Sequence, residues 1–145
     1  MYRRILVPLE NSEADETILV HVRDLARFCG ASLVLIHVAD GWVARNIEPL
    51  ELRESEEMRG DWQYLDDLTA RLRAEGCRVE AVLAAGEPAV EIAAAAEREG
   101  CDLIAMATHG HRGLQDVVRG TVASELRHRT LVPVLMVRMP RKDPG

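Results

Sequence analysis

Short, continuous apolar runs alternate along this chain with longer stretches in which apolar residues recur every three or four positions. Continuous runs are typical of strands that are buried on both faces, whereas the three-to-four spacing is typical of amphipathic helices. The continuous runs predict five strands, at residues 5–9, 33–38, 79–83, 103–107 and 132–137. A helical stretch separates each strand from the next, so the chain follows a repeated β-α pattern.

Four helices are predicted between these strands. Their apolar positions are, in chain order, Ala14, Ile18, Val22, Leu25 and Ala26; Met58, Trp62, Leu65, Leu68 and Leu72; Ile92 and Ala96; and Val118, Val122 and Leu126. Asn11 and Ser12 offer capping side chains to the first helix, and Gly30 and Gly76 follow the first and second helices. Pro88 is expected in the first turn of the third helix, because proline needs no N–H partner there.

Strands that alternate with helices favour a parallel sheet with right-handed crossovers. We therefore expect an α/β fold: a doubly wound, five-stranded parallel sheet with strand order 3-2-1-4-5 and helices on both faces. Periodicity alone does not prove this order. In such sheets ligands bind beyond the carboxyl ends of the strands, where the winding reverses. This rule places residues 8–10 and 107–110 beside the expected binding crevice.

Composition narrows the functional classes. With 145 residues, of which 48% are apolar, the chain fits one domain over residues 1–145, with a variable loop and helix start at 40–60 and a tail at 139–145. We expect no membrane segment, because no apolar stretch approaches about 20 residues. The basic-then-apolar opening is too short for a signal peptide, so we expect a soluble, cytoplasmic protein. The net charge of −6 argues against nucleic acid as a partner.

The clearest chemical signal runs from the end of the fourth strand to the start of the following helix. There Gly110 and Gly113 follow His109, and Gly120 precedes Thr121. Glycines let the backbone approach a polyphosphate, and a helix N-terminus supplies free N–H groups and a favourable dipole. Thr121 and nearby arginines, Arg112 and Arg119, would add a hydroxyl donor and positive charge. The same glycines also suit ordinary turns, and their spacing alone leaves both interpretations open.

Segments along the whole chain resemble the universal stress protein family. Those in the carboxyl-terminal half are LIAMATHG and RGTVASELRHRTLVPVLMVR, and earlier ones are ILVPLENSE, LIHVAD and GEPAVEIAAAAEREGCDLI. The resemblance covers almost the whole chain apart from residues 41–61. It implies binding of ATP through a motif Gly-x-x-Gly-x9-Gly-Ser/Thr, whose matching positions here are Ala107, Gly110, Gly120 and Thr121.

By the same resemblance, the backbone of Val38 would pair with the adenine edge, in apolar surroundings. Phosphates would lie against the amides of the glycine motif and Val122. Together these considerations give the expected nucleotide site: Pro8, Leu9, Glu10, Val38, Met106, Ala107, His109, Gly110, Arg112, Gly113, Gly120, Thr121 and Val122. Val38 also suits the role of an ordinary strand residue.

Three positions depart from the pattern of the ATP-binding relatives. Ala107 replaces the first glycine and adds a methyl group to the surface that the phosphates approach. Glu10 stands where those relatives usually have aspartate near the ribose and metal, and we expect it to be the carboxylate ligand of Mg²⁺ that arrives with ATP. Asn11 replaces a glycine, but asparagine tolerates left-handed backbone geometry.

No nucleophile, base and orienting group can be assembled from the sequence, so hydrolysis of ATP is expected to be slow at most. His37 is expected to be a hydrogen-bonded core or rim side chain rather than a catalytic base. Our interpretation is an ATP-binding, stress-response regulatory module that acts as a dimer and is recognised by an unknown protein partner. Two alternatives stay open: a dimeric interaction protein of the same family that binds no nucleotide, and an enzyme of the related adenine-nucleotide α-hydrolase fold.

A homodimer is expected through the carboxyl-terminal strand, because residues 134–137 would otherwise leave an apolar sheet edge exposed. Pro133 lacks an N–H donor, which favours an outward orientation for its backbone and for those of Leu135 and Val137. Alternatively, Pro133 merely starts the strand.

Overall fold

The computed structural model describes residues 1–40, 51–108 and 122–140, without the side chains of residues 40 and 51–58. Within these ranges the strands are β1 (Arg4–Leu9), β2 (Ser32–Asp40), β3 (Val79–Gly86), β4 (Leu103–Thr108) and β5 (Val134–Arg138). They form one parallel sheet in the order β3-β2-β1-β4-β5, which confirms the predicted topology.

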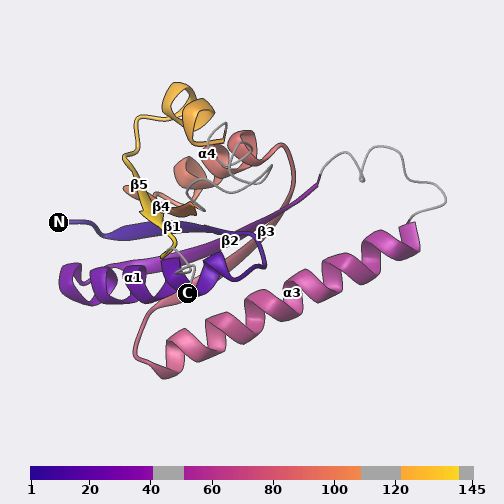
Figure 1. Ribbon diagram of the computed structural model, residues 1–145, viewed down its shortest axis with the longest axis horizontal. Coiled ribbons are helices and arrows are strands. Elements are labelled where there is room, and N and C mark those ends of the chain that lie inside the picture. The colour runs from indigo at the N-terminus through magenta and orange to yellow at the C-terminus, as the bar shows by residue number, and fades with distance from the viewer. Residues whose placement is uncertain (41–50, 109–121, 141–145) are drawn as a thin grey trace, which may run out of the picture.

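Helices cover both faces of the sheet, as Figure 1 shows. The described helices are α1 (Ala14–Cys29), α3 (Glu51–Ala74), α4 (Pro88–Arg98) and a helical segment at residues 122–129. Side chains of α1 and α3 pack into a core cluster on one face, and those of α4 and residues 122–129 pack into a second cluster on the other. None of these helices combines the length and the apolar character that crossing a bilayer requires.

The buried run of β1 explains its central place. Ile5, Leu6, Val7 and Leu9 are at most 3% exposed, and successive side chains alternate between the two core clusters. A strand covered on both faces has no polar alternation, so the continuous apolar run predicted it correctly. β2 and β3 extend past their predicted ends to Asp40 and Gly86, because they continue to pair with each other beyond the end of β1.

One of two local expectations is wrong. Trp62 was expected on the buried face of its helix, but it is 43% exposed, while Leu65, Leu68 and Leu72 are buried. The same turn of α3 contacts the rest of the domain through Asp61 and Tyr64, so Trp62 lies beside the face that packs on the sheet. The capping expectation is confirmed for Ser12: its hydroxyl accepts the Ala14 N–H at 3.3 Å, and the Asp15 carboxylate accepts the Ser12 N–H at 3.3 Å.

The outward orientation expected for Pro133 is also wrong. The Ile104 N–H donates to the Pro133 carbonyl at 2.9 Å, and the Met139 N–H donates to the Thr108 carbonyl at 2.8 Å. Backbone groups of successive strand residues point to opposite neighbours, so the odd-numbered residues of β5 face β4. The outer edge is therefore formed by Val134, Met136 and Arg138. Proline is tolerated at position 133 because its carbonyl still serves the ladder at the start of the strand.

Candidate functional site

A cavity of about 240 Å³ opens at the carboxyl ends of β1 and β2. Its lining comprises Pro8, Leu9, Glu10, Ile36, His37, Val38, Pro88, Ile92 and Val122. Five of the residues expected at the nucleotide site therefore line one cavity, although they come from three separate parts of the sequence. The lining combines two strand ends, the start of α4 and the first described residue of the helical segment 122–129.

Met106 and Ala107 of β4 lie deeper in the protein. Met106 is fully buried in the core cluster that also contains Ile36, Ile92 and Val122 of the cavity wall. Ala107 is 7% exposed and packs into the cluster on the opposite face, against α1. The extra methyl group is thus taken up by the core rather than by the cavity. The remaining expected residues, His109, Gly110, Arg112, Gly113, Gly120 and Thr121, lie outside the described part of the chain.

The backbone of Val38 faces the side of the sheet on which β1 ends. The Ser32 N–H donates to the Arg3 carbonyl at 3.0 Å, and the Leu33 N–H donates to the Arg78 carbonyl at 2.8 Å. The alternation of backbone groups then directs those of even-numbered β2 residues, including Val38, toward β1. The last pair of β1 and β2 is Leu9 with His37, so the Val38 N–H faces the Leu9 carbonyl, whereas the Val38 carbonyl lies past the end of β1, next to the cavity.

Asp15 organises the loop that carries Glu10. This aspartate is 2% exposed, and its carboxylate accepts the N–H groups of Glu10, Asn11 and Ser12 at 3.0, 2.8 and 3.3 Å. The Tyr64 hydroxyl of α3 donates to the same carboxylate at 2.5 Å. Asn11 takes a φ of 60°, in agreement with its expected tolerance of left-handed geometry.

Sequence reasoning missed Asp15. Ser12 and Asp15 have the spacing of a capping box, in which an acid in the first helical turn reaches back to N–H groups before the helix, and this signal would have found it. Burial, followed by the hydrogen bond to Asp15, raises the pKa of the Tyr64 phenol well above its ordinary value of 10.0. The phenol therefore stays a hydrogen-bond donor at any physiological pH.

His37 connects three elements at the rim of the cavity. Its Nδ1 lies 2.9 Å from the Leu9 carbonyl, and its Nε2 lies 3.5 Å from a carboxylate oxygen of Asp61 in α3. A carbonyl oxygen only accepts hydrogen bonds, so Nδ1 carries the proton in this arrangement. The side chains of His37 and Asp61 are 15% and 18% exposed. His37 is thus a hydrogen-bonded rim residue, as expected, and it joins the end of β1 to α3.

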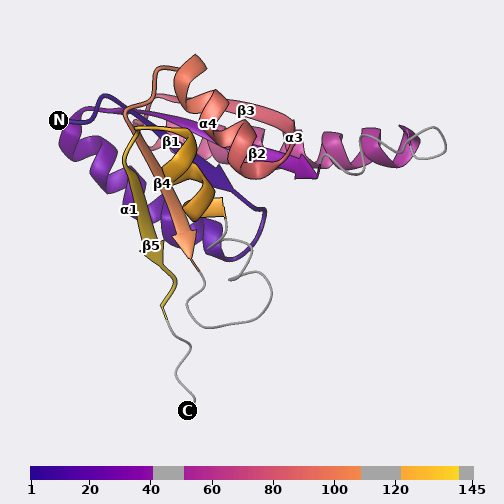
Figure 2. The same ribbon diagram turned by 90° about the horizontal axis from the view of Figure 1, so that it is seen from above.

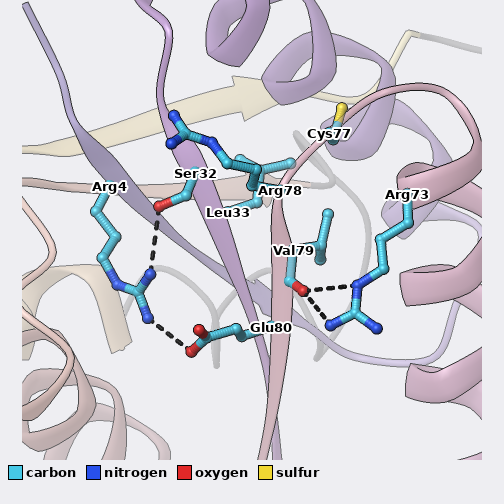
Figure 3. A pocket seen from close by; sticks show the side chains of 8 residues that line it. All are labelled: Arg4, Ser32, Leu33, Arg73, Cys77, Arg78, Val79 and Glu80. Atoms are coloured by element: carbon cyan, nitrogen blue, oxygen red, sulfur yellow. Dashed lines mark hydrogen bonds and ion pairs between the residues drawn. The ribbon is translucent and has the colours of Figure 1, made fainter.

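A larger hollow of about 510 Å³ lies at the amino ends of the strands (Figure 3). Its arginines are occupied within the protein: Arg4 donates to Ser32, Glu80 and Glu99, and Arg73 donates twice to the Val79 carbonyl. Ligands of doubly wound sheets bind at the opposite, carboxyl ends of the strands. We therefore take the smaller cavity as the candidate site. Within the described ranges, no three potential metal-ligating side chains lie together.

Comparison with known proteins agrees with this geometry. The sequence profile of the universal stress protein family matches residues 1–138. Universal stress protein MJ0577 of Methanocaldococcus jannaschii is 26% identical over an alignment of 155 positions, gaps included. The alignment covers 95% of this chain and 96% of that protein. The solved structure of MJ0577 superimposes with a TM-score of 0.85 at 27% identity and covers 98% of this chain and 99% of its own.

Two more distant structures show the same fold with a nucleotide bound. A universal stress protein in complex with cAMP has a TM-score of 0.69 at 17% identity, covering 94% of this chain and 97% of its own. The universal stress protein of Archaeoglobus fulgidus in complex with dAMP has a TM-score of 0.69 at 21% identity, covering 94% and 98%. At these identities the likeness concerns the fold.

Proposed function

This chain belongs to the universal stress protein family, and we propose that it binds an adenine nucleotide, ATP with Mg²⁺, in the cavity at the carboxyl ends of β1 and β2. The observation that carries the proposal is the meeting of Pro8, Leu9, Glu10, Val38 and Val122 around one cavity. The protein would act as a nucleotide-dependent regulatory module in stress responses.

The cavity has the features that an adenine ring needs. Its walls are largely aliphatic, with Ile36, Val38 and Ile92 among them, and the Val38 carbonyl lies past the last residue of β1 that pairs with β2. A flat apolar slot with one strand edge beside it can bury the ring and hydrogen-bond its polar edge. The complexes of two fold relatives with cAMP and dAMP support adenine as the base.

The size of the cavity bears on where the phosphates go. Pockets for drug-sized ligands measure about 300–1,000 Å³, so a described cavity of about 240 Å³ accommodates a base and part of a sugar. The triphosphate would extend toward the glycine motif at Gly110, Gly120 and Thr121. Glu10, whose carboxylate accepts the Ser12 hydroxyl at 2.7 Å, supplies the hard oxygen donor that Mg²⁺ prefers.

Calorimetric titration of the purified protein with ATP and Mg²⁺ tests this proposal. Val38→Trp should fill the cavity and weaken binding at least about tenfold, which corresponds to about 1.4 kcal/mol. Val20→Trp is the matched control, because Val20 lies on α1 and is 49% exposed. The proposal fails if the folded wild-type protein binds neither ATP, ADP nor AMP up to about 1 mM, the weak end of measurable affinities.

Hydrolysis is proposed to be far slower than in typical enzymes, whose median turnover is about 10 per second. The Glu10 carboxylate, which accepts the Ser12 hydroxyl at 2.7 Å, is assigned to Mg²⁺ in this proposal and not to the activation of water. A phosphate-release assay with ATP and Mg²⁺ checks this point. A turnover near the enzyme median would instead favour an enzyme of the adenine-nucleotide α-hydrolase type.

We further propose that two copies pair through the outer edge of β5. The N–H and C=O groups of Val134, Met136 and Arg138 face away from β4, and the Met136 side chain is 43% exposed. Such an edge is a ready template for a second strand. A protein partner that recognises the nucleotide-bound dimer would complete the module.

The second candidate function is a dimeric interaction protein that binds no nucleotide. The observation that favours it is Ala107, which stands in place of the first glycine of the family's ATP motif. The same calorimetric titration separates the two functions, because only the first predicts heat of binding and loss of that heat in Val38→Trp.

A further inference from the structure

Helix α3 reaches the candidate site through two side chains that are three residues apart. Asp61 contacts His37, and Tyr64 donates to Asp15. Residues at this spacing lie on one face of a helix, so a single turn of α3 contacts both structures that shape the cavity rim. Neither Asp61 nor Tyr64 lines the cavity itself.

The contact of Tyr64 acts on the loop after β1. Its hydroxyl donates to the buried carboxylate of Asp15, which in turn accepts the N–H groups of Glu10 and Asn11. Because Asp15 is 2% exposed, water cannot readily replace the phenol as its fourth donor. Removing the hydroxyl should therefore loosen the carboxylate and, with it, the backbone that places Glu10 at the cavity.

The contact of Asp61 acts on the end of β1. The carboxylate lies 3.5 Å from Nε2 of His37, whose Nδ1 donates to the Leu9 carbonyl. His37 is a cavity-lining residue, so the orientation of its ring affects the shape of the cavity wall beside Leu9 and Val38.

From this geometry we infer that Asp61 and Tyr64 are positioning residues for the nucleotide: one turn of α3 holds the Glu10 loop and the His37 ring at the separation that the ligand needs. The inference rests on the proposed function and assigns a role to α3. Figure 2 shows α3 continuing from this turn to well beyond the sheet. Thermodynamic coupling is reciprocal: if the contacts of this turn with Asp15 and His37 strengthen nucleotide binding, then bound nucleotide strengthens those contacts.

Two conservative variants test the inference, each with a matched control. Tyr64→Phe removes only the hydroxyl and Asp61→Asn removes only the charge, whereas Tyr2→Phe and Asp66→Asn make the same changes elsewhere. Trp62, which lies between the two positions and is 43% exposed, reports on this turn of α3 by its fluorescence in a Trp42→Phe background. ATP with Mg²⁺ is the probe, and affinity is measured by calorimetry well below each variant's Tm.

We expect Tyr64→Phe to weaken binding of ATP with Mg²⁺ by about three- to tenfold, the effect of one lost hydrogen bond. Asp61→Asn should weaken binding by a similar factor, because it removes the negative charge beside His37. Both controls should keep wild-type affinity. ATP should change the Trp62 emission of the wild-type background, with a smaller change in Tyr64→Phe. Without nucleotide, amide hydrogen exchange at residues 10–12 should be faster in Tyr64→Phe than in the wild type. A loss of global stability alone would accelerate exchange throughout the protein and not only in that loop.

The outcomes separate this inference from the proposal on which it rests. If the wild-type protein binds ATP and both folded variants bind it equally well, the positioning role is refuted while the function stands. If the wild-type protein binds no nucleotide, the function fails and the positioning role fails with it. A fall in affinity in the two controls as large as in the two variants would also overturn the positioning role.

Discussion

Replacing Asp15 with alanine removes a buried carboxylate that holds the loop between β1 and α1. Four donors converge on it: the N–H groups of Glu10, Asn11 and Ser12 and the Tyr64 hydroxyl. Three of the four distances are 3.0 Å or less, and the longest, from Ser12, is 3.3 Å. The Ser12 contact is therefore the weakest of the set.

The magnitude follows from these contacts. Hydrogen bonds to a charged group contribute about 1.5–3 kcal/mol each, but bonds that share one acceptor are not additive. Asn11 is exposed, so its N–H can donate to water when the Asp15 carboxylate is removed. The Tyr64 hydroxyl is partly buried and finds such a replacement less readily. We therefore expect Asp15→Ala to lower the free energy of unfolding by about 3–5 kcal/mol, a large part of the 5–15 kcal/mol typical of a domain.

Urea unfolding followed by circular dichroism measures this change. Asp15→Asn should lower the free energy of unfolding by about half as much. The amide oxygen of asparagine still accepts two N–H groups, whereas its NH₂ group cannot accept a hydrogen bond. Asp24→Ala is the matched control on the same helix: the Asp24 side chain is 68% exposed, and the expected change is within about 0.5 kcal/mol. A loss below about 1 kcal/mol for Asp15→Ala would refute the reasoning, because the loop would then be held by other contacts.

The pKa of Tyr64 is raised in the folded protein, so the protein should lose stability in alkali. The phenol contributes fully to the free energy of unfolding below its unfolded pKa of 10.0, and this contribution is lost as the pH rises through the higher pKa of the folded state. The difference in unfolding free energy between wild type and Tyr64→Phe, measured in urea between pH 8 and pH 11, should therefore shrink above about pH 10; a constant difference would contradict this. Leu65→Ala should cost about 2–5 kcal/mol by the same assay, because Leu65 is fully buried, whereas Trp62→Ala should cost less than about 1 kcal/mol. Equal costs would show that Trp62 packs against the sheet.

The fold could be predicted from the sequence because central parallel strands leave an unambiguous pattern. β1, β2 and β4 are buried on both faces, so their apolar runs are continuous and their order followed from the usual topology of doubly wound sheets. The position of Trp62 was not predictable in this way. Apolar periodicity marks one face of α3, but it does not show which side chains at the border of that face are buried.

The candidate site was predictable only in part, for a similar reason. Residues at the ends of apolar strands, such as Leu9 and Val38, were found because topology brings strand ends together. Tyr64 reaches Asp15 from a helix 49 positions further along the chain, and Asp61 contacts His37 from the same helix. Helical periodicity does not fix such contacts between polar side chains, since many rotations of α3 would keep its leucines buried.

The edge of β5 shows a third limit of the pattern, and it leads to a reversed prediction. Residue parity along a strand decides which N–H groups bond to β4. The missing N–H of Pro133 favoured an outward parity, but its carbonyl accepts the Ile104 N–H, so the parity is the opposite one. Leu135→Pro should thus remove a donor to β4 and lower the free energy of unfolding by about 3 kcal/mol. Met136→Pro changes only the outer edge, so thermal unfolding should stay near wild type while light scattering shows the dimer lost to monomer. Monomer mass for the wild-type protein at micromolar concentration would refute the dimer, and a stable Leu135→Pro beside an unfolded Met136→Pro would refute the parity.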